Sequence, residues 1–183
     1  AKKKQSKIVF FTGIILCAIL AGIWGGETSY LMPDLYPLYY GGIAWRQLGN
    51  AYSLKPVVPE STYDDQILAI GNAYPLPAVL ILLPLTYLPP KIASTVWVII
   101  LTVGILIALR ISHLPYYFLL YLPILDGINL QQYAILVAAL QFIALWAYEQ
   151  HHDWILEICC TLIPTKPSQG LIFVLALVLL TRK

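Results

Sequence analysis

Two long apolar runs without a single charge constrain this chain more than any other feature. They cover Ile8–Gly26 and Ile92–Leu109. At about 1.5 Å per residue, a helix of roughly 20 residues covers the ~30 Å hydrocarbon core of a bilayer. Only 11% of the 183 residues are charged, whereas a soluble domain usually carries about 25%. The sequence therefore predicts an integral membrane protein.

The first apolar run is expected to be a retained helix with the N-terminus in the cytoplasm. Several lysines precede Ile8, and basic residues favour the cytoplasmic side. A cleaved signal peptide is the alternative, but its apolar region would be about 7–15 residues long. This run is longer and passes into Trp24, an interfacial residue type.

The stretch 27–73 is predicted to be the first extracytoplasmic loop. It holds several acids but only Arg46 and Lys55 as cations, and a lack of basic residues is typical of the non-cytoplasmic side. Within it, Leu35–Leu48 has helical spacing and predicts a short interfacial helix, although Gly41-Gly42 weakens the pattern.

Prolines interrupt most of the later apolar segments. Tyr74–Pro90 carries five of them, so any helix there is short and kinked. Leu114–Leu125 is too short to cross a membrane alone, whereas Leu130–Tyr148 is long enough. Trp154–Ile163 and Ser168–Leu180 form two halves of a hairpin. The predicted fold is all-α: a polytopic transmembrane helical bundle with broken or re-entrant helices, forming a single domain over residues 1–183.

The charges at the turns predict which groups share a membrane face. The C-terminal Arg182-Lys183 favours the cytoplasm. The turn at Lys166 then lies outside, the turn Glu149–Asp153 inside, and the turn Asp126–Gln132 outside, on the side of Asp34. This arrangement requires one of the two proline-rich segments to be re-entrant or only partly inserted, and the sequence leaves open which one.

The groups on that face suit a transfer reaction. A carboxylate such as Asp34 can take a proton from a hydroxyl group, and a lysine such as Lys166 can balance a leaving phosphate. Taken alone, each has an ordinary explanation: a helix cap for Asp34, snorkelling for Lys166, and a turn for Asp126-Gly127. Their combination predicts that an acceptor hydroxyl loses a proton while a phosphate leaves.

Other function classes find little support. No basic stripe with interleaved aromatic residues indicates a nucleic-acid partner. The three cysteines lie in apolar segments and have neither metal-ligand nor disulfide spacing. Glycine-rich phosphate loops, nucleophile elbows and zinc-protease motifs are absent from the sequence.

Several short pieces occur along the chain in a characteristic order: Asp34, Tyr39–Gly42, Leu48–Tyr52, Tyr74–Pro77, Pro84, Leu88-Pro89, Trp97, Gly127–Gln132 and Lys166-Pro167. In these pieces the chain resembles the N-terminal half of a GT-C-type glycosyltransferase, close to the bacterial polyprenyl-phosphate-mannose-dependent mannosyltransferases. The usual turn motif of that family is Gly-Gln-x-Asn, whereas here the same residue types occur in another order.

The resemblance implies an inverting hexosyltransferase of the bacterial plasma membrane. It would move a sugar, mannose being the first candidate, from a polyprenyl-phosphate donor to an extracytoplasmic acceptor, with Asp34 as the catalytic base. Some members of the family use a divalent metal, but the sequence shows no reliable ligand set, and no metal ligands are predicted. Membrane lipids and the lipid-linked donor are the expected partners. The predicted substrate-binding residues are Tyr39, Tyr40, Arg46, Tyr74, Asn129, Gln131, Gln132 and Lys166.

Two alternatives accompany this prediction. The family is considerably longer than 183 residues, so the sequence is either a fragment or a shortened relative, and a shortened relative could be a non-catalytic accessory subunit of a larger membrane complex. A transporter or lipid-binding protein is the other alternative, because Pro164 and Pro167 would suit a substrate path. The intramembrane charge that such a path often needs is sparse, with Glu157 as its candidate.

Overall fold

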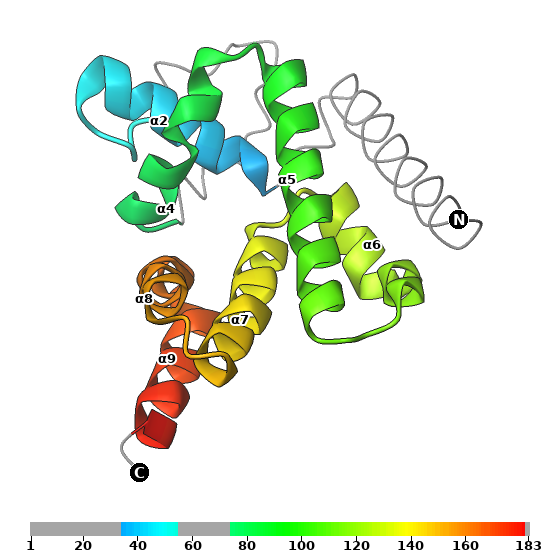
Figure 1. Ribbon diagram of the computed structural model, residues 1–183. Helices are drawn as coiled ribbons and strands as arrows, with labels where there is room; N and C mark the ends of the chain where they lie inside the picture. The colour runs from blue at the N-terminus through cyan, green and yellow to red at the C-terminus, as the bar shows by residue number, and fades with distance from the viewer. Residues whose placement is uncertain (1–33, 55–73, 182–183) are drawn as a thin grey trace.

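The computed structural model describes residues 34–54 and 74–181, which contain helices and no β-strand (Figure 1). The predicted helix Ile8–Gly26, the N-terminal lysines and most of the loop 27–73 lie outside the described residues. The helices are α2 (Leu35–Leu48), α4 (Leu76–Leu82), η2 (Leu83–Tyr87), α5 (Pro90–Ile111), η3 (Tyr116–Leu120), α6 (Leu122–Asn129), α7 (Tyr133–Glu149), α8 (Asp153–Leu162), η4 (Ile163–Thr165) and α9 (Pro167–Thr181), where η denotes a 3-10 helix.

Helices α5 and α7 form the centre of the fold and run in the same direction (Figure 1). Near their first turns, Trp97 stacks on Tyr133, with ring centroids 6.0 Å apart and ring planes 9° apart. Further along, a Cβ built at Gly104 would lie 3.5 Å from the Cβ of Ala139. Small residues at this contact let the two helix backbones approach closely.

The helix predicted over Leu35–Leu48 is present with the same bounds, while its interfacial position stays a prediction. Its last turn ends at Gly49, which has a φ of 68°, the left-handed conformation that glycine adopts at little cost at the end of a helix. Leu35, Leu38 and Ala44 are fully buried. The paired glycines do not interrupt this helix. Gly42 packs closely against Thr86 of η2, because a Cβ at this position would lie 2.5 Å from the Thr86 Cγ2.

The proline-rich segment 74–90 stays at the α2 end of the fold. Prolines occupy the first turns of α4, η2 and α5, positions where the missing N–H costs nothing. The segment lies next to α2 at both ends: Tyr74 is close enough to Asp34 for its charge to act on the hydroxyl group, and the Tyr39 hydroxyl donates to the Leu88 carbonyl at 2.7 Å. Which of the two proline-rich segments is re-entrant in the membrane stays a prediction.

The second proline-rich segment is a broken helix, η3 followed by α6. Asp126 and Gly127 lie inside α6, so the prediction that they form a turn is wrong. Pro123 in the first turn starts the helix, and a Cβ at Gly127 would lie 2.5 Å from the Ile135 Cδ1. The glycine thus serves close packing of α6 on α7, and the chain turns only at residues 130–132.

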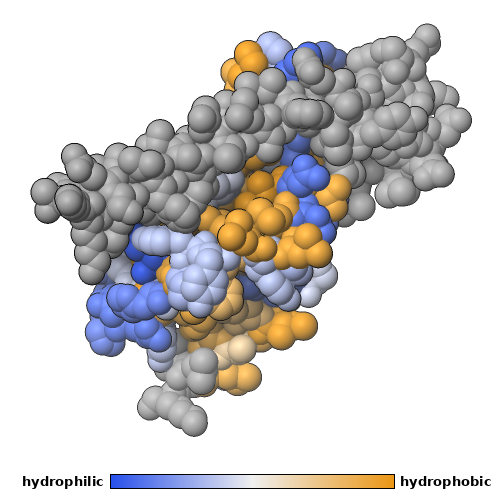
Figure 2. Space-filling view, turned by 90° about the vertical axis from the view of Figure 1, so that its right-hand side faces the viewer, coloured by the Kyte–Doolittle hydropathy of each residue, from blue (hydrophilic) through white to orange (hydrophobic). Residues whose placement is uncertain are grey.

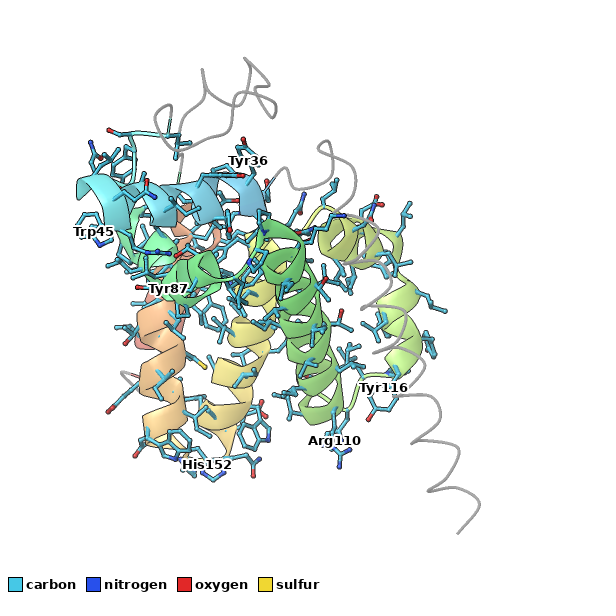
Figure 3. The ribbon with its side chains drawn as sticks, turned by 90° about the horizontal axis from the view of Figure 1, so that it is seen from above. Tyr36, Trp45, Tyr87, Arg110, Tyr116 and His152 are labelled. Atoms are coloured by element: carbon cyan, nitrogen blue, oxygen red, sulfur yellow. The ribbon has the colours of Figure 1, made fainter. Side chains whose placement is uncertain are left out.

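The remaining helices connect two opposite ends of the fold. Figure 3 shows Tyr36 and Trp45 of α2 at one end, and Arg110 and His152 at the other. Helix α7 runs toward the His152 end and α8 returns from it, which brings η4 and Lys166 back to the end where α7 begins.

Among the described residues, one helix, Pro90–Ile111, is long and apolar enough to cross a membrane. Helix α7 is apolar but has 17 residues, fewer than the roughly 20 that a span needs. It begins at Tyr133 rather than Leu130 because Gln131 and Gln132 adopt non-helical conformations. The all-helical class is confirmed, whereas the polytopic arrangement of its spans stays a prediction.

Large apolar side chains remain exposed on the outer helices. Figure 2 shows hydrophobic residues gathered across the middle of one face. Exposed fractions reach 73% for Leu120 in η3 and 72% for Ile172 in α9. Exposed apolar patches are typical of contact with lipid or with another protein surface.

Candidate functional site

The Asp34 carboxylate lies beside a tyrosine of the following segment. Asp34 is the N-cap residue of α2, but its side chain makes no capping hydrogen bond to the helix. Burial, and then the charge of the neighbouring Asp34, raise the pKa of Tyr74 well above its ordinary value. Tyr74 therefore keeps its proton at physiological pH.

Lys166 contacts the same tyrosine from the other half of the chain. Its Nζ lies 5.9 Å from the centroid of the Tyr74 ring, within the ~6 Å over which an aromatic face attracts a cation. Lys166 lies between η4 and α9 and is half-buried. We call Asp34, Tyr74, Tyr133 and Lys166 the Tyr74 cluster. Three of its members, Asp34, Tyr74 and Lys166, were singled out by the sequence, and the fold brings them together.

Tyr133, the fourth member, was missed by the sequence analysis. Its ring meets the Tyr74 ring edge-on at 5.9 Å, and its hydroxyl shares a 2.7 Å hydrogen bond with the Thr165 hydroxyl. Tyr133 is fully buried. A signal was available, since a tyrosine that begins an apolar helix beside a polar turn needs a partner for its hydroxyl group once buried.

Gln131 is turned into the fold. It is 1% exposed, its Nε2 donates to the Ser94 hydroxyl at 2.7 Å, and its backbone carbonyl accepts from the Trp97 Nε1 at 2.9 Å. Its φ of 56° is the left-handed region, which costs a residue other than glycine about 1–3 kcal/mol. The two hydrogen bonds of Gln131 attach the turn to α5 and position Trp97 for its stack on Tyr133.

The two other amide side chains that the sequence proposed lie nearer the surface. Asn129 ends α6 and is exposed, and Gln132 is half-buried at the start of α7. They flank the buried Gln131, so the turn divides into one buried and two accessible amide groups.

Tyr39 and Tyr40 pack inside α2 and its neighbours. They are only 5% and 7% exposed, and the Tyr40 ring contacts the rings of Tyr36 and Tyr39 at 4.5 and 5.1 Å. Burial and the neighbouring hydroxyl groups raise the pKa of Tyr40 to about 12. Both side chains are therefore neutral at physiological pH and act first as packing residues.

Arg46 lies away from the Tyr74 cluster. It occupies the last turn of α2, about 18 Å from Asp34 at 1.5 Å per residue. Its NH1 donates to the Thr86 carbonyl at 2.8 Å and to the Thr86 hydroxyl at 3.0 Å, and its guanidinium lies 3.9 Å from the centroid of the Tyr87 ring. Figure 3 shows Tyr87 beside α2 on the Trp45 side. Arg46 thus ties η2 to α2.

We expect Arg46→Ala to lower the melting temperature of the purified protein by about 2–4 °C, since the lost hydrogen bonds stabilise by about 1 kcal/mol. Turnover should change by less than about threefold. The neighbouring Gln47 is exposed, and Gln47→Ala is the matched control, with no shift expected. A loss of turnover in Arg46→Ala at unchanged melting temperature would instead indicate that Arg46 contacts substrate.

Among the described residues, no group of three or more histidine, cysteine or acidic side chains could hold a metal ion. Asp126 lies exposed in α6.

Comparison with known proteins identifies one family. The model of glycosyltransferase family 87 matches residues 72–183, which include every member of the Tyr74 cluster except Asp34. No curated protein and no solved structure matches the chain.

Proposed function

The chain belongs to glycosyltransferase family 87, and from this we propose that it transfers a sugar from a polyprenyl-phosphate donor to an extracytoplasmic acceptor, with inversion. The family is of the GT-C membrane type, and membership indicates glycosyltransferase activity. The sequence resemblance to polyprenyl-phosphate-mannose-dependent enzymes supports the lipid donor and makes mannose the first sugar to test.

A single observation carries the proposal: a carboxylate and an ammonium group from distant parts of the chain lie on the same tyrosine, the carboxylate through its charge on the hydroxyl group and the ammonium 5.9 Å from the ring centroid. Asp34 takes the proton of the acceptor hydroxyl while the acceptor oxygen forms a bond to the anomeric carbon of the sugar. The bond from that carbon to the phosphate oxygen breaks on the opposite face, and the electron pair leaves with the lipid phosphate. Lys166 stabilises the negative charge on that phosphate.

The surroundings favour Asp34 over a tyrosine as the base. Burial raises the pKa of Tyr39, Tyr40 and Tyr74, so these hydroxyl groups keep their protons at physiological pH. Asp34 is only half-buried, which leaves its carboxylate within reach of an acceptor.

The accessible amide groups supply the sugar contacts in this proposal. Asn129 ends α6 and Gln132 directly precedes Tyr133 of the Tyr74 cluster, and amide side chains both donate to and accept from sugar hydroxyl groups. Gln131, Tyr39, Tyr40 and Arg46 support the site through the contacts described above rather than by touching the sugar.

The test is transfer by the purified full-length chain in liposomes supplied with a polyprenyl-phosphate sugar and a simple acceptor. We expect transfer from the lipid-linked sugar, starting with mannose, and a product of inverted anomeric configuration by NMR. The matched control is the corresponding nucleotide sugar, which should not serve as a donor. Transfer from the nucleotide sugar, or retention of configuration, would contradict the proposal. Activity only with stoichiometric partner proteins would favour the accessory-subunit alternative.

A further inference from the structure

Tyr133 lies between the two halves of the Tyr74 cluster. Its ring meets the Tyr74 ring at 5.9 Å, and its hydroxyl oxygen lies 2.7 Å from the hydroxyl oxygen of Thr165, the residue before Lys166. Building on the function proposed above, we propose that Tyr133 is a positioning residue, whose hydrogen bond to Thr165 holds the Lys166 ammonium group where the donor phosphate leaves.

The first argument is the direction of the hydrogen bonds. A hydroxyl group has one proton to donate and two lone pairs that accept. The Thr165 hydroxyl donates its proton to the Leu162 carbonyl at 2.5 Å, so Tyr133 is the donor in its bond to Thr165. The hydrogen bonds therefore run in one direction, from the start of α7 through Thr165 to the residue that caps the start of η4.

The second argument is that Lys166 is joined through its backbone to the element that Tyr133 holds. The Lys166 N–H donates to the Ile163 carbonyl of η4 at 3.3 Å, and the Lys166 carbonyl accepts from two N–H groups of the first turn of α9 at 3.1 and 2.8 Å. The position of η4 therefore sets the point from which the lysine side chain reaches its place 5.9 Å from the centroid of the Tyr74 ring.

The third argument is that Tyr133 is itself fixed. It begins α7, and its side chain is fully buried. Its ring stacks on Trp97 with the planes 9° apart, and the Trp97 Nε1 donates to the Gln131 backbone carbonyl at 2.9 Å. A buried and stacked ring has little freedom to move, so its hydroxyl group can hold η4 to the tolerance of about 0.5 Å that a preorganised site needs.

The first experiment breaks the bond between Tyr133 and Thr165 from each side. Tyr133→Phe keeps the ring and its stack, and Thr165→Val keeps the shape of the threonine side chain. For each variant of the full-length protein we expect kcat/KM for the lipid-linked sugar to fall about 10- to 100-fold, because a displacement of about 1 Å can cost about 100-fold. Since the two variants break the same bond independently, a folding failure of one leaves the other to decide.

Two further variants serve as controls. Thr165→Ser retains the hydroxyl group and should keep kcat/KM within about threefold of the wild type. Thr102→Val removes a hydroxyl group of a threonine that is equally buried and also donates to a backbone carbonyl, that of Val98 at 2.8 Å. Thr102 lies within α5 and takes no part in the bond between Tyr133 and Thr165, so kcat/KM should again stay within about threefold.

The second experiment asks whether the bond acts through the ammonium group, and it needs no turnover. Binding of polyprenyl phosphate, the product that carries the leaving phosphate, is measured for the wild type, Tyr133→Phe, Lys166→Met and the double variant. Residues that act through one another give non-additive effects, so Tyr133→Phe should weaken binding about 5- to 10-fold in the wild type but less than about twofold in Lys166→Met. A bond that only stabilised the fold would weaken binding equally in both backgrounds.

The outcomes separate this inference from the function on which it rests. If the wild type transfers sugar but Tyr133→Phe and Thr165→Val keep the kcat/KM of Thr102→Val, the positioning role is overturned and the transferase stands. Equal weakening of polyprenyl phosphate binding with and without the Lys166 ammonium group would overturn the positioning role in the same way. If binding shows the expected non-additivity but the wild type transfers nothing from lipid-linked sugars, the positioning role stands and the proposed transfer is overturned.

Discussion

Asp34→Asn is expected to lower the turnover of the enzyme about 100- to 10,000-fold, the usual contribution of a general base. The substitution preserves the shape of the side chain and removes only its charge. The melting temperature should therefore stay close to that of the wild type, so that the loss is chemical. Initial rates with a lipid-linked sugar in liposomes provide the measurement.

The matched control for this variant is Asp126→Asn. Asp126 is exposed on α6. Its substitution by asparagine removes the same charge at a position outside the Tyr74 cluster, so turnover should be unchanged. Turnover within about threefold of the wild type in Asp34→Asn would mean that another group is the base. A comparable loss in Asp126→Asn would instead support a role for both acids around a divalent metal.

Gly170→Ala is expected to have the largest effect on the fold. Gly170 lies in the first turn of α9 and is buried against η4. A Cβ there would lie inside contact distance of the Ile163 carbonyl oxygen, 2.6 Å from the carbonyl carbon and 2.8 Å from the Pro164 Cα. These are backbone atoms, which cannot move aside as the end of a side chain can. We expect a loss of at least about 2 kcal/mol of stability, measured as a lower melting temperature and folded yield.

Because Lys166 lies between η4 and α9, Gly170→Ala should also displace its ammonium group and raise KM for the lipid-linked sugar. The control is Gly104→Ala, where the new Cβ would lie 3.5 Å from the Ala139 Cβ, an ordinary contact. Since alanine is favoured over glycine in a helix by about 1 kcal/mol, that variant should be neutral or more stable. Equal melting temperatures for the two variants would show that η4 and α9 can separate at no cost.

Local signals in the sequence were sufficient for the helices that prolines delimit. Pro77, Pro84, Pro90 and Pro167 all lie in first turns, where proline is compatible with a helix, and the bounds of α2 followed from helical spacing. The same local reasoning failed at Asp126-Gly127. This pair favours a turn on its own, but the glycine is used for packing against Ile135, which only the tertiary structure reveals.

The charged residues of the candidate site stood out in the sequence, whereas the residues that pack around them could be predicted only in part. Asp34 and Lys166 stood out because charges are rare in this chain. The contact through Tyr74, and the part played by Tyr133, depend on how α5, α7 and η4 meet. The burial of Gln131 was not predictable either, since the same amide group is suited to binding a sugar until its hydrogen bond to Ser94 is known.

The attachment of segment 74–88 to α2 at both ends has a consequence for how the site accommodates substrates of different size. One end lies beside the base itself and the other is joined through Tyr39, with Arg46 adding a third link along the helix. A tilt of α2 therefore carries Tyr74 along with the base. The ammonium group belongs instead to the hairpin of α8 and α9 and meets the Tyr74 ring at 5.9 Å. A shift of that hairpin would change the distance between the ammonium group and the base, as sugars of different size require, without changing the surroundings of the base.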